Sequence, residues 1–423
     1  MNLRIVGGSL ARQVRRYSYK PVRRVPLPPA SNATPDAKKA DGFSLGKELR
    51  ARIVASGPIP IATYMKQVLT NPAAGYYMTA NHNVFGSRGD FITSPEIGQI
   101  FGEVLAVWSL NEWHKFGRPV PFQLIELGPG KGTMMNDILR VYGKFKVTAG
   151  LSVHLVEMSE HLSKVQAALL CRSSTEYGDK PFYRSGVTAD GLKVYWYRRL
   201  EDVPQVFSII FAHEFFDALP IHKFVKEGDS WKEVLIDVDQ QNSEKFRFVA
   251  SKADTPMLRL FLNSYCSESM ADRNHVEISF ESESVIQEIG NRLSSNGGLA
   301  LIVDYGHLGD KGDTFRAFRN HKLYNPLEEP GCADLTADVD FSLLKQFCDR
   351  TGKIFTIGPT SQRAFLELAG AKERLEVLLA GASSEEERHR LTDGFRMLTD
   401  EDQMGSRFKF FALLPKELKE IYN

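Results

Sequence analysis

Three glycines at alternate positions, directly after an apolar run, constrain the fold of this chain more than any other feature. Residues 124–132 read Leu-Ile-Glu-Leu-Gly-Pro-Gly-Lys-Gly, and apolar residues recur at helical spacing in the segment that follows. Alternate glycines let a chain turn sharply from a strand into a helix, and they let the backbone approach a ligand that any Cβ atom would obstruct. We therefore predict a strand over residues 121–127, a helix over residues 133–142 and a nucleotide-type cofactor at the turn between them.

The spacing of the glycines distinguishes among nucleotide sites. A phosphate-binding P-loop needs a glycine where Ile125 stands and a Ser or Thr where Gly132 stands, and a dinucleotide site needs a glycine where Thr133 stands. What remains is acid-x-Gly-x-Gly-x-Gly, the pattern of S-adenosylmethionine-dependent methyltransferases. The alternative is a turn without a ligand, although such turns seldom need three alternate glycines. The residues that this pattern assigns to the cofactor are Glu126, Gly128, Gly130 and Gly132.

A second apolar segment extends the cofactor site. Residues 151–156 are apolar and partly β-branched, they end at Glu157, and a helical pattern covers residues 160–170. In a doubly wound sheet, an acid at the carboxyl end of the second strand can accept hydrogen bonds from both ribose hydroxyls. We therefore predict Glu157 as a cofactor ligand, with a solvated helix-cap acid as the alternative.

Later segments continue the alternation of strands and helices. Helical patterns at 284–293 and 341–351 lie among them, and the interval between the fourth and fifth strands is too long for one crossover. This order predicts a Rossmann-like, mostly parallel, seven-stranded α/β sheet of the class I methyltransferase type, with an N-terminal helical region and inserted segments. The five further strands are expected at 193–197, 206–211, 298–303, 353–357 and 408–414.

Two insertions interrupt the expected sheet, at about 221–283 and 307–340. Residues 224–237 and 245–249 alternate apolar and polar side chains around Gly228-Asp229, which predicts an antiparallel hairpin within the first insertion. Before the sheet, helices are expected at 43–56 and 61–69, and residues 75–103 are expected to form a glycine-rich loop. The regions of the chain are then a presequence and linker (1–41), a helical and loop region (42–120), the methyltransferase domain (121–415) and a tail (416–423).

Composition excludes several classes of protein. Of 423 residues, 43% are hydrophobic and 25% charged, which is typical of a globular protein. The net charge is +1, but the first 35 residues hold seven Arg and Lys and no acid, so the remainder carries about −6 and is not a nucleic-acid-binding surface by charge. No apolar run reaches about 18 residues, so no membrane span is expected. The four cysteines form no C-x-x-C pair and the histidines no H-E-x-x-H motif, so we expect no metal.

The first 19 residues have the composition of a targeting segment. They hold four arginines, two serines and scattered apolar residues, without the uninterrupted apolar core of a secretory signal. An amphipathic mitochondrial presequence fits this pattern, and the alternative is a basic tail that binds RNA or membrane.

The loop after the fourth strand holds the candidate catalytic residues. Methyl transfer from a sulfonium is an in-line displacement, so the main task of the protein is to align the reactants and to exclude water. If the acceptor is a guanidinium, a carboxylate can orient it, and Glu214 is the first candidate and Asp217 the second. His213 is the candidate proton acceptor. The alternatives are a helix-cap role for Asp217 and a packed strand-end histidine at position 213, and Asp304 either caps the fifth strand or faces the pocket.

Six blocks of sequence, spread over most of the chain, together identify a family. The blocks are Gly75-Tyr-Tyr, Gly89-Asp-Phe-Ile-Thr-Ser-Pro-Glu96, Glu126-Leu-Gly-Pro-Gly-Lys-Gly-Thr133, His213-Glu-Phe-Phe-Asp-Ala-Leu-Pro220, Val303-Asp-Tyr-Gly-His307 and Asp334-Leu-Thr-Ala-Asp-Val-Asp-Phe341. They resemble the MidA family, with Lys131 in place of an arginine. The resemblance implies a mitochondrial matrix methyltransferase that uses S-adenosylmethionine and symmetrically dimethylates an arginine in the 49-kDa subunit of respiratory complex I during assembly. The double-glutamate loop of better-known arginine methyltransferases is absent in recognisable form, so the block from His213 would replace it.

Three functions remain open from the sequence. The first is an arginine methyltransferase that acts on a complex I subunit. The second is a complex I assembly chaperone with an inactive or secondary methyltransferase fold, against which the intact glycines and Glu157 argue. The third is methylation of a small molecule, against which the two long insertions argue, because such additions suit a protein-sized partner.

Overall fold

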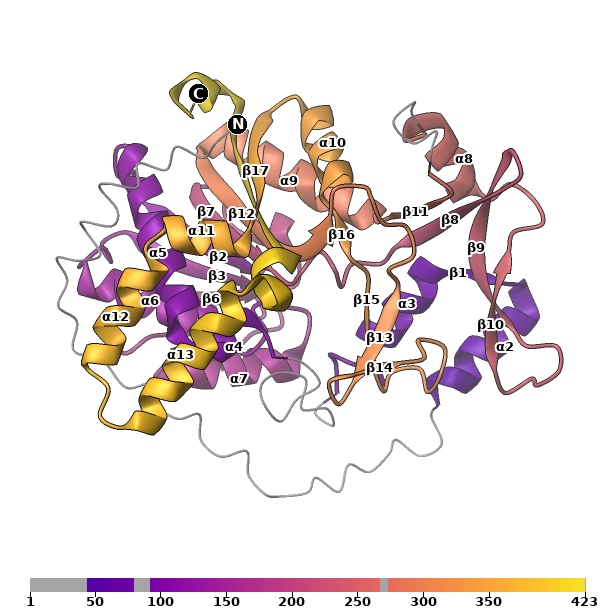
Figure 1. Cartoon of the computed structure of the whole chain (residues 1–423), viewed down its shortest axis with the longest axis horizontal. Helices are drawn as coiled ribbons and strands as arrows, with labels where there is room; N and C mark the ends of the chain where they lie inside the picture. The colour runs from indigo at the N-terminus through magenta and orange to yellow at the C-terminus, as the bar shows by residue number, and fades with distance from the viewer. Residues whose placement is uncertain (1–43, 80–91, 267–272, 423) are drawn as a thin grey trace.

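The computed structural model describes residues 44–79, 92–266 and 273–422 (Figure 1). The expected presequence and linker, and residues 89–91 of the second family block, lie outside the described residues. Among the helices that are described, none combines the length and the apolar character needed to cross a bilayer.

The main sheet has the strand order β17-β18-β12-β7-β2-β3-β6-β5-β4. Its parallel centre consists of β12 (Gly298–His307), β7 (Phe207–His213), β2 (Phe122–Leu127), β3 (Leu151–Val156) and β6 (Lys193–Tyr197). At one side β18 (Phe408–Pro415) runs antiparallel between β12 and β17 (Ile354–Ser361). The seven predicted strands and the Rossmann-like class are thus confirmed. Three further strands, β4 (Ser173–Glu176), β5 (Arg184–Val187) and β16 (Val339–Asp340), were not predicted.

Helices cover both faces of this sheet, which explains why its central strands are buried along their whole length. Side chains of β2 alternate between two apolar cores: Leu124 belongs to one and Ile125 to the other. The first core is completed by α5 (Gln99–Lys115), α6 (Thr133–Lys144), α7 (Glu160–Leu170), α11 (Gln362–Leu368), α12 (Ala371–Ala380) and α13 (Glu385–Thr399). The second core is completed by α8 (Pro256–Ser264), α9 (Phe280–Asn296) and α10 (Phe341–Thr351).

The expectation of a loop throughout residues 75–103 was wrong in its last part. Residues 94–97 form the short helix α4 (Ser94–Ile97), and the long helix α5 begins at Gln99. Apolar side chains on α5 are buried around most of its circumference, so its sequence shows no amphipathic stripe by which a surface helix is recognised.

Most of the two insertions and the N-terminal helices form a second body, which we call the satellite lobe (Figure 1, right-hand side), whereas α8 contributes to the second core and β16 pairs with β12. The predicted hairpin is confirmed as β8 (His222–Glu227), β9 (Ser230–Val238) and β10 (Phe246–Ala250), and β11 (His275–Ile278) pairs with β8. The N-terminal elements of the lobe are α2 (Leu45–Ser56), β1 (Ile59–Pro60) and α3 (Ile61–Thr70), and β1 pairs with β9. A small sheet of β13 (Arg316–Arg319), β14 (Lys322–Tyr324) and β15 (Asp334–Thr336) completes it.

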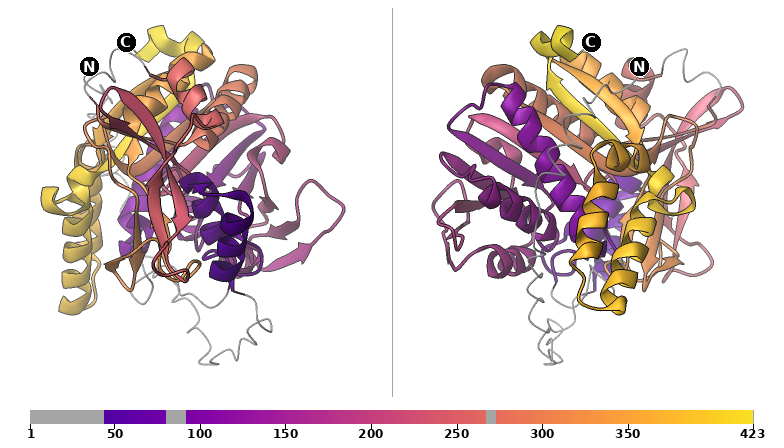
Figure 2. Two further views of the ribbon diagram at one scale, coloured as in Figure 1. Left: turned by 90° about the vertical axis from the view of Figure 1, so that its right-hand side faces the viewer. Right: turned by 60° about the vertical axis from the view of Figure 1, so that its left-hand side comes forward.

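The satellite lobe has an apolar core of its own, drawn from all three of its sequence segments. Seen from the side, the lobe lies in front of the main sheet (Figure 2). Segments that are distant in sequence therefore meet at the seam between the lobes, close to the carboxyl ends of the parallel strands. This is the edge at which ligands of open α/β sheets bind.

Candidate active site

The glycine turn has the backbone geometry that its sequence requires. Gly128, Gly130 and Gly132 have φ angles of +61°, +54° and +82°, a region that favours glycine, and α6 begins immediately afterwards. A Cβ atom at Gly128 would lie 3.1 Å from the Phe215 ring. The turn therefore joins strand to helix as predicted, with its backbone close to the loop that follows β7.

Glu157 lies beside the turn at the end of β3. Its Oε1 accepts a hydrogen bond from the Ser159 amide (2.7 Å), and its Oε2 accepts one from the Gln166 side chain (3.0 Å). The same Gln166 Nε2 donates to the carbonyl of Gly130 (2.7 Å). Gln166 thus connects the glycine turn to the predicted ribose ligand. The sequence analysis missed this residue, although a glutamine on the buried face of the 160–170 helix was a signal for it.

Glu126, at the end of β2, carries an unsatisfied oxygen. Its side chain is buried, and its Oε2 has no hydrogen-bond partner in the described part of the chain. Burial, and then the nearby charge of Glu157, raise the pKa of Glu126 to about 8, while burial raises the pKa of Glu157 to about 7. A buried acceptor of this kind fits a ligand that brings N–H or O–H donors, which agrees with the cofactor assignment of both residues.

The segment around Glu96, in helix α4, contacts the residues at the end of the glycine turn. Glu96 accepts a hydrogen bond from the Thr133 hydroxyl, and its other oxygen lies 3.8 Å from Lys131 Nζ. Between this segment, the turn and the end of β7 is a cavity of about 50 Å³. This cavity is lined by Glu126, Gly128, Gly130 and Glu214, so residues predicted for the cofactor and for the acceptor border the same space. A larger groove of about 910 Å³ lies along β17, β18 and the end of α5, but none of the predicted site residues line it.

Asp304 holds the loop that follows β7. Its Oδ2 accepts hydrogen bonds from three consecutive backbone amides, those of Phe215 (3.2 Å), Phe216 (3.1 Å) and Asp217 (3.3 Å). Glu214, directly before these residues, has a φ of +48°, which is uncommon outside glycine. The carboxylate of Asp304 thus stabilises the conformation of the β7 loop, a role that differs from both alternatives given for this residue, a cap of the fifth strand and an acid that faces the pocket.

The loop brings Glu214 and Asp217 together. Asp217 Oδ2 accepts hydrogen bonds from the Tyr305 hydroxyl and from Thr336 Oγ1 (2.8 Å), and no helix begins at Asp217, so its helix-cap alternative is wrong. Asp217 Oδ1 and Glu214 Oε1 are both buried without a hydrogen-bond partner among the described residues. Burial raises the pKa of both carboxyls, and the charge of Asp217 raises that of Glu214 further. The loop thus carries two carboxyl oxygens that are buried without a hydrogen-bond partner in the described part of the chain, and the catalytic roles of Glu214 and Asp217 stay predictions.

His213 is packed between aromatic rings at the end of β7. Its ring lies 5.0 Å from the Phe101 ring and 6.2 Å from the Phe408 ring, measured between centroids. Burial lowers the pKa of His213 to about 3, so its imidazole is neutral at physiological pH. Its Nε2 lies 3.4 Å from Glu214 Oε1. The structure therefore shows the packed strand-end histidine, and the role of His213 as a proton acceptor stays a prediction.

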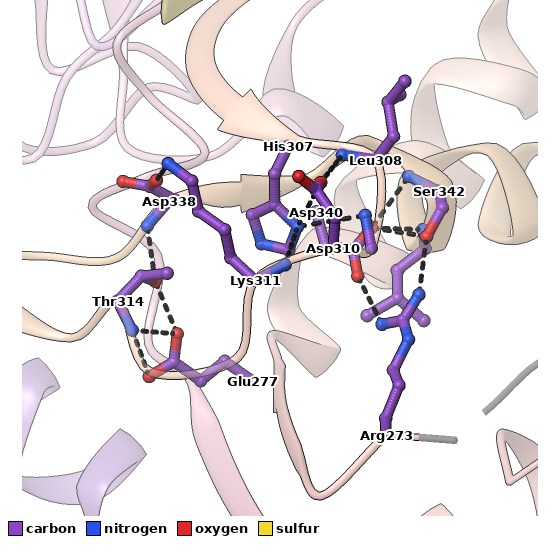
Figure 3. A network of polar contacts seen from close by, with 12 residues as sticks. Arg273, Glu277, His307, Leu308, Asp310, Lys311, Thr314, Asp338, Asp340 and Ser342 are labelled. Atoms are coloured by element: carbon purple, nitrogen blue, oxygen red, sulfur yellow. Dashed lines mark hydrogen bonds and ion pairs between the residues drawn. The ribbon is translucent and has the colours of Figure 1, made fainter. Parts of the chain in front are cut away.

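His307, which ends the fifth family block, lies in a different network (Figure 3). Its Nδ1 accepts a hydrogen bond from the Gly309 amide (3.0 Å). Around it, Arg273 donates to Asp340 (2.8 Å), and the Thr314 amide donates to Glu277 (3.0 Å) (Figure 3). These contacts fasten the segment after β12 to β11 and to the start of α10. They hold the second insertion against the main sheet.

Comparisons with known proteins agree with this geometry. The family model for S-adenosyl-L-methionine-dependent methyltransferases matches residues 104–360. The mitochondrial protein arginine methyltransferase NDUFAF7 homolog of Drosophila melanogaster is 49% identical over 417 residues, which cover 95% of this chain and 94% of the relative. Mitochondrial protein arginine methyltransferase NDUFAF7 of Homo sapiens is 46% identical over 377 residues, 88% of this chain and 83% of the relative.

A solved structure shares the fold. The crystal structure of a Burkholderia thailandensis protein bound to S-adenosyl-homocysteine matches with a TM-score of 0.69 at 24% sequence identity, and the match covers 88% of this chain and 91% of that one. Fold, glycine turn and relatives lead to one conclusion. The chain belongs to the family of mitochondrial S-adenosylmethionine-dependent methyltransferases that includes NDUFAF7, and S-adenosylmethionine is its methyl donor.

Proposed function

We propose that this protein transfers methyl groups from S-adenosylmethionine to an arginine of a protein in the mitochondrial matrix. The observation that carries the proposal is the pair of buried, unsatisfied carboxylate oxygens on Glu214 and Asp217 beside the glycine turn. A guanidinium stays charged at every physiological pH and offers five N–H donors in a fixed plane, so it can satisfy both oxygens at once. The relatives named as protein arginine methyltransferases support the same acceptor.

The part of the site that binds the methyl donor, which we call the donor side, consists of the residues around the glycine turn. Gly128, Gly130 and Gly132 allow the backbone to approach the cofactor, and Glu126 and Glu157 offer carboxylate oxygens to its amino and hydroxyl groups. When bound, S-adenosylmethionine supplies a methyl group that its sulfonium activates for displacement. Gln166 positions this side by holding Glu157 and the turn at a fixed separation.

The part of the site that binds the methyl acceptor, which we call the acceptor side, aligns and deprotonates the guanidinium. Glu214 and Asp217 orient its plane and localise its charge away from the attacking nitrogen, since a carboxylate beside an N–H group attracts positive charge towards it. That nitrogen forms a bond to the methyl carbon as the carbon–sulfur bond breaks, and it loses one proton. Glu214 accepts this proton, because burial raises the pKa of its carboxyl, whereas burial lowers the pKa of the neighbouring His213 and makes its imidazole the weaker base. The segment around Glu96 covers the turn and excludes water.

We further propose the substrate and the product. The substrate is an arginine of the 49-kDa subunit of respiratory complex I, the product is symmetric dimethylarginine, and the reaction serves assembly of the complex. The resemblance of the six sequence blocks to the MidA family supports this assignment. An assembly chaperone with a secondary methyltransferase fold is the alternative, and the intact glycine turn, in which all three glycines have positive φ, favours the enzyme.

The test uses purified protein, radiolabelled S-adenosylmethionine and a mitochondrial matrix extract. Wild type is expected to label a protein of the size of the 49-kDa subunit, and hydrolysis of that protein is expected to yield symmetric dimethylarginine. Gly130→Val should abolish labelling and cofactor binding, because a branched side chain is strained at a φ of +54° and obstructs the ligand. Gly191→Val is the matched control, since Gly191 has a φ of +85° and open space around a built Cβ, away from the site.

Each other outcome contradicts part of the proposal. Label in small molecules alone assigns the protein to small-molecule methylation. Wild-type protein that binds the cofactor and labels nothing supports the chaperone alternative. If the radiolabel is found in asymmetric dimethylarginine, the protein methylates arginine, but the proposal of a symmetric product is wrong.

A further inference from the structure

The side chain of Gln166 connects two parts of the cofactor site from behind. Gln166 lies on α7 and is fully buried. Its Nε2 donates hydrogen bonds to the carbonyl of Gly130 (2.7 Å) and to Glu157 Oε2 (3.0 Å). A Cβ atom at Gly132 would lie 3.4 Å from Gln166 Cγ, so the stem of this side chain also packs against the turn. One residue thus contacts the glycine turn at two points and the predicted ribose ligand at a third.

Trp196 determines the orientation of the Gln166 amide. Trp196 lies on β6, is fully buried, and donates from its Nε1 to Gln166 Oε1 (2.8 Å). An indole N–H donates and never accepts, so the amide atom beside it has to be the oxygen. The amide nitrogen then faces the Gly130 carbonyl and Glu157 Oε2, and both of these atoms are acceptors. The reverse orientation would place donor against donor and acceptor against acceptor, so one orientation alone satisfies all three contacts.

Glu157 is held through its main chain as well as its side chain. Its amide donates to the Tyr197 carbonyl (2.9 Å), its carbonyl accepts from the Tyr183 hydroxyl (2.8 Å), and its Oε1 accepts from the Ser159 amide (2.7 Å). A carboxylate has roughly four acceptor positions, so these contacts and the one from Gln166 use only part of its capacity. Glu157 also keeps 8% of its surface exposed. The remaining positions can accept hydrogen bonds from the two neighbouring hydroxyls of a ribose.

The Gln166 amide also favours the charged form of Glu157. Burial raises the pKa of this carboxyl to about 7, whereas the hydrogen bonds from the Ser159 amide and the Gln166 side chain act in the opposite direction. A charged carboxylate accepts stronger hydrogen bonds than a neutral carboxyl group does. Loss of the Gln166 amide would therefore change both the direction and the charge of the predicted ribose ligand.

We propose that Gln166 and Trp196 are positioning residues for the ribose of the cofactor: the indole fixes the amide, and the amide fixes the Glu157 carboxylate relative to the glycine turn. Their role depends on the proposed function, in which Glu157 binds the ribose, and it extends the donor side to two buried residues behind that carboxylate. Because the carboxylate is held where both hydroxyls reach it, the site distinguishes a ribose with two hydroxyls from one with a single hydroxyl.

The test compares the affinities of the full chain for S-adenosyl-homocysteine and for its 2′-deoxy analogue, measured by titration calorimetry. Wild type is expected to bind the analogue about tenfold more weakly, because the analogue lacks one hydrogen bond to a carboxylate. Gln166→Met keeps the length of the side chain and lacks its amide. It is expected to weaken S-adenosyl-homocysteine about tenfold and the analogue about threefold, so the preference for two hydroxyls falls to about threefold.

Trp196→Phe keeps a ring and removes the N–H that orients the amide, and it is expected to weaken S-adenosyl-homocysteine about threefold. The double variant should bind as Gln166→Met does, because Trp196 acts on the carboxylate only through Gln166. The matched control is Gln123→Met. Gln123 is a buried glutamine at the opposite end of β2, whose Nε2 donates to the Pro204 carbonyl (2.8 Å) and to Ser208 Oγ (2.9 Å). Its replacement should leave both affinities unchanged.

The outcomes that overturn the proposal are distinguishable. If Gln166→Met weakens both ligands equally, Gln166 supports the fold alone and does not position the ribose ligand. If the double variant binds more weakly than Gln166→Met, Trp196 does not act through Gln166. Wild type that binds both ligands equally shows that Glu157 is not the ribose ligand, while labelling of arginine still decides the proposed reaction. If Gln166→Met does not fold, an unchanged preference for two hydroxyls in Trp196→Phe overturns the proposal.

Discussion

At the scale of single residues, the sequence predicts a position best where backbone geometry dictates the residue type. The alternate glycines at 128, 130 and 132 all have positive φ, so their pattern alone indicated a strand-to-helix turn. Glu214 also has positive φ, but nothing in its residue type shows this. Its conformation depends on Asp304, which lies on another strand and accepts three amides of the following loop.

Contacts between residues that are distant in sequence also determine the site as a whole. His213, Glu214 and Asp217 could be proposed because they stand together in one loop at the end of a predicted strand. Asp334 and Tyr77 are 257 positions apart, and only the folded seam brings their side chains into contact. Local pattern therefore predicts residues that stand close together in the sequence, whereas contacts between distant segments appear only in the folded chain.

Glu126 makes the stability of the protein dependent on pH. Its carboxyl has a pKa of about 8 in the folded protein and an ordinary value of 4.5, so the folded state holds the proton more tightly. The stabilising effect is complete below the ordinary pKa and is lost as the pH rises through about 8. The free energy of unfolding of the ligand-free protein should fall by about 3 kcal/mol between pH 6 and pH 9 because of this residue. Urea denaturation across this range measures it.

Glu126→Gln removes this titrating group and should reduce the fall in stability by about 3 kcal/mol, whereas the part that comes from Glu157, whose pKa burial raises to about 7, remains. Glu417→Gln, a change at an exposed glutamate near the C-terminus, is the control and should leave the profile unchanged. A wild-type stability that rises between pH 6 and pH 9, or a Glu126→Gln profile as steep as wild type, contradicts the assignment of a raised pKa.

At the scale of elements, burial decides which parts of the fold the sequence reveals. Central strands such as β2 and β7 are buried on both faces and therefore appear as continuous apolar runs, whereas β17 at the side of the sheet is mostly half-buried. Strand β4 has the sequence Ser-Ser-Thr-Glu and is exposed along its length, so it offers no apolar pattern. Helix α5 was missed for the opposite reason, since it is buried around most of its circumference.

A buried ion cluster holds three helices together on one face of the sheet. Glu103 on α5 accepts hydrogen bonds from Arg140 on α6 and Arg374 on α12, each at 2.5 Å, and is 4% exposed. Removing one partner of a buried charge pair leaves an uncompensated charge, so Glu103→Gln should lower the free energy of unfolding by about 3–5 kcal/mol. Urea denaturation at neutral pH measures this loss.

The matched control is Glu385→Gln, which removes a carboxylate from the exposed pair between Glu385 and Arg388 on α13. Exposed pairs contribute ~0–1 kcal/mol, so this variant should unfold almost as wild type does. Equal, small losses for Glu103→Gln and Glu385→Gln would show that the buried cluster does not hold the helices together.

At the scale of the whole molecule, the two lobes divide the work of the site. The glycine turn, Glu126 and Glu157 belong to the main sheet, and all of them lie on the donor side. The acceptor side contacts β15 of the satellite lobe, whose N-terminal helices and insertions share one apolar core. Because these segments are far apart in sequence, the sequence predicted them as an N-terminal helical region and two separate insertions. Their packing against one another could not be inferred from local pattern.

This division predicts where each ligand changes amide hydrogen exchange. S-adenosyl-homocysteine should slow exchange in peptides that cover residues 126–132 and 157–166, because the donor side closes around it, and should leave residues 222–250 of the satellite lobe unchanged. At 100 times its Kd, it should also stabilise the folded protein by about 2.7 kcal/mol. Addition of the 49-kDa subunit to this complex should then slow exchange at residues 214–217 and 334–337, on both sides of the seam. If the subunit slows exchange on the main sheet alone, the acceptor does not enter between the lobes. If S-adenosyl-homocysteine slows exchange at residues 222–250, the donor side is not separate from the satellite lobe.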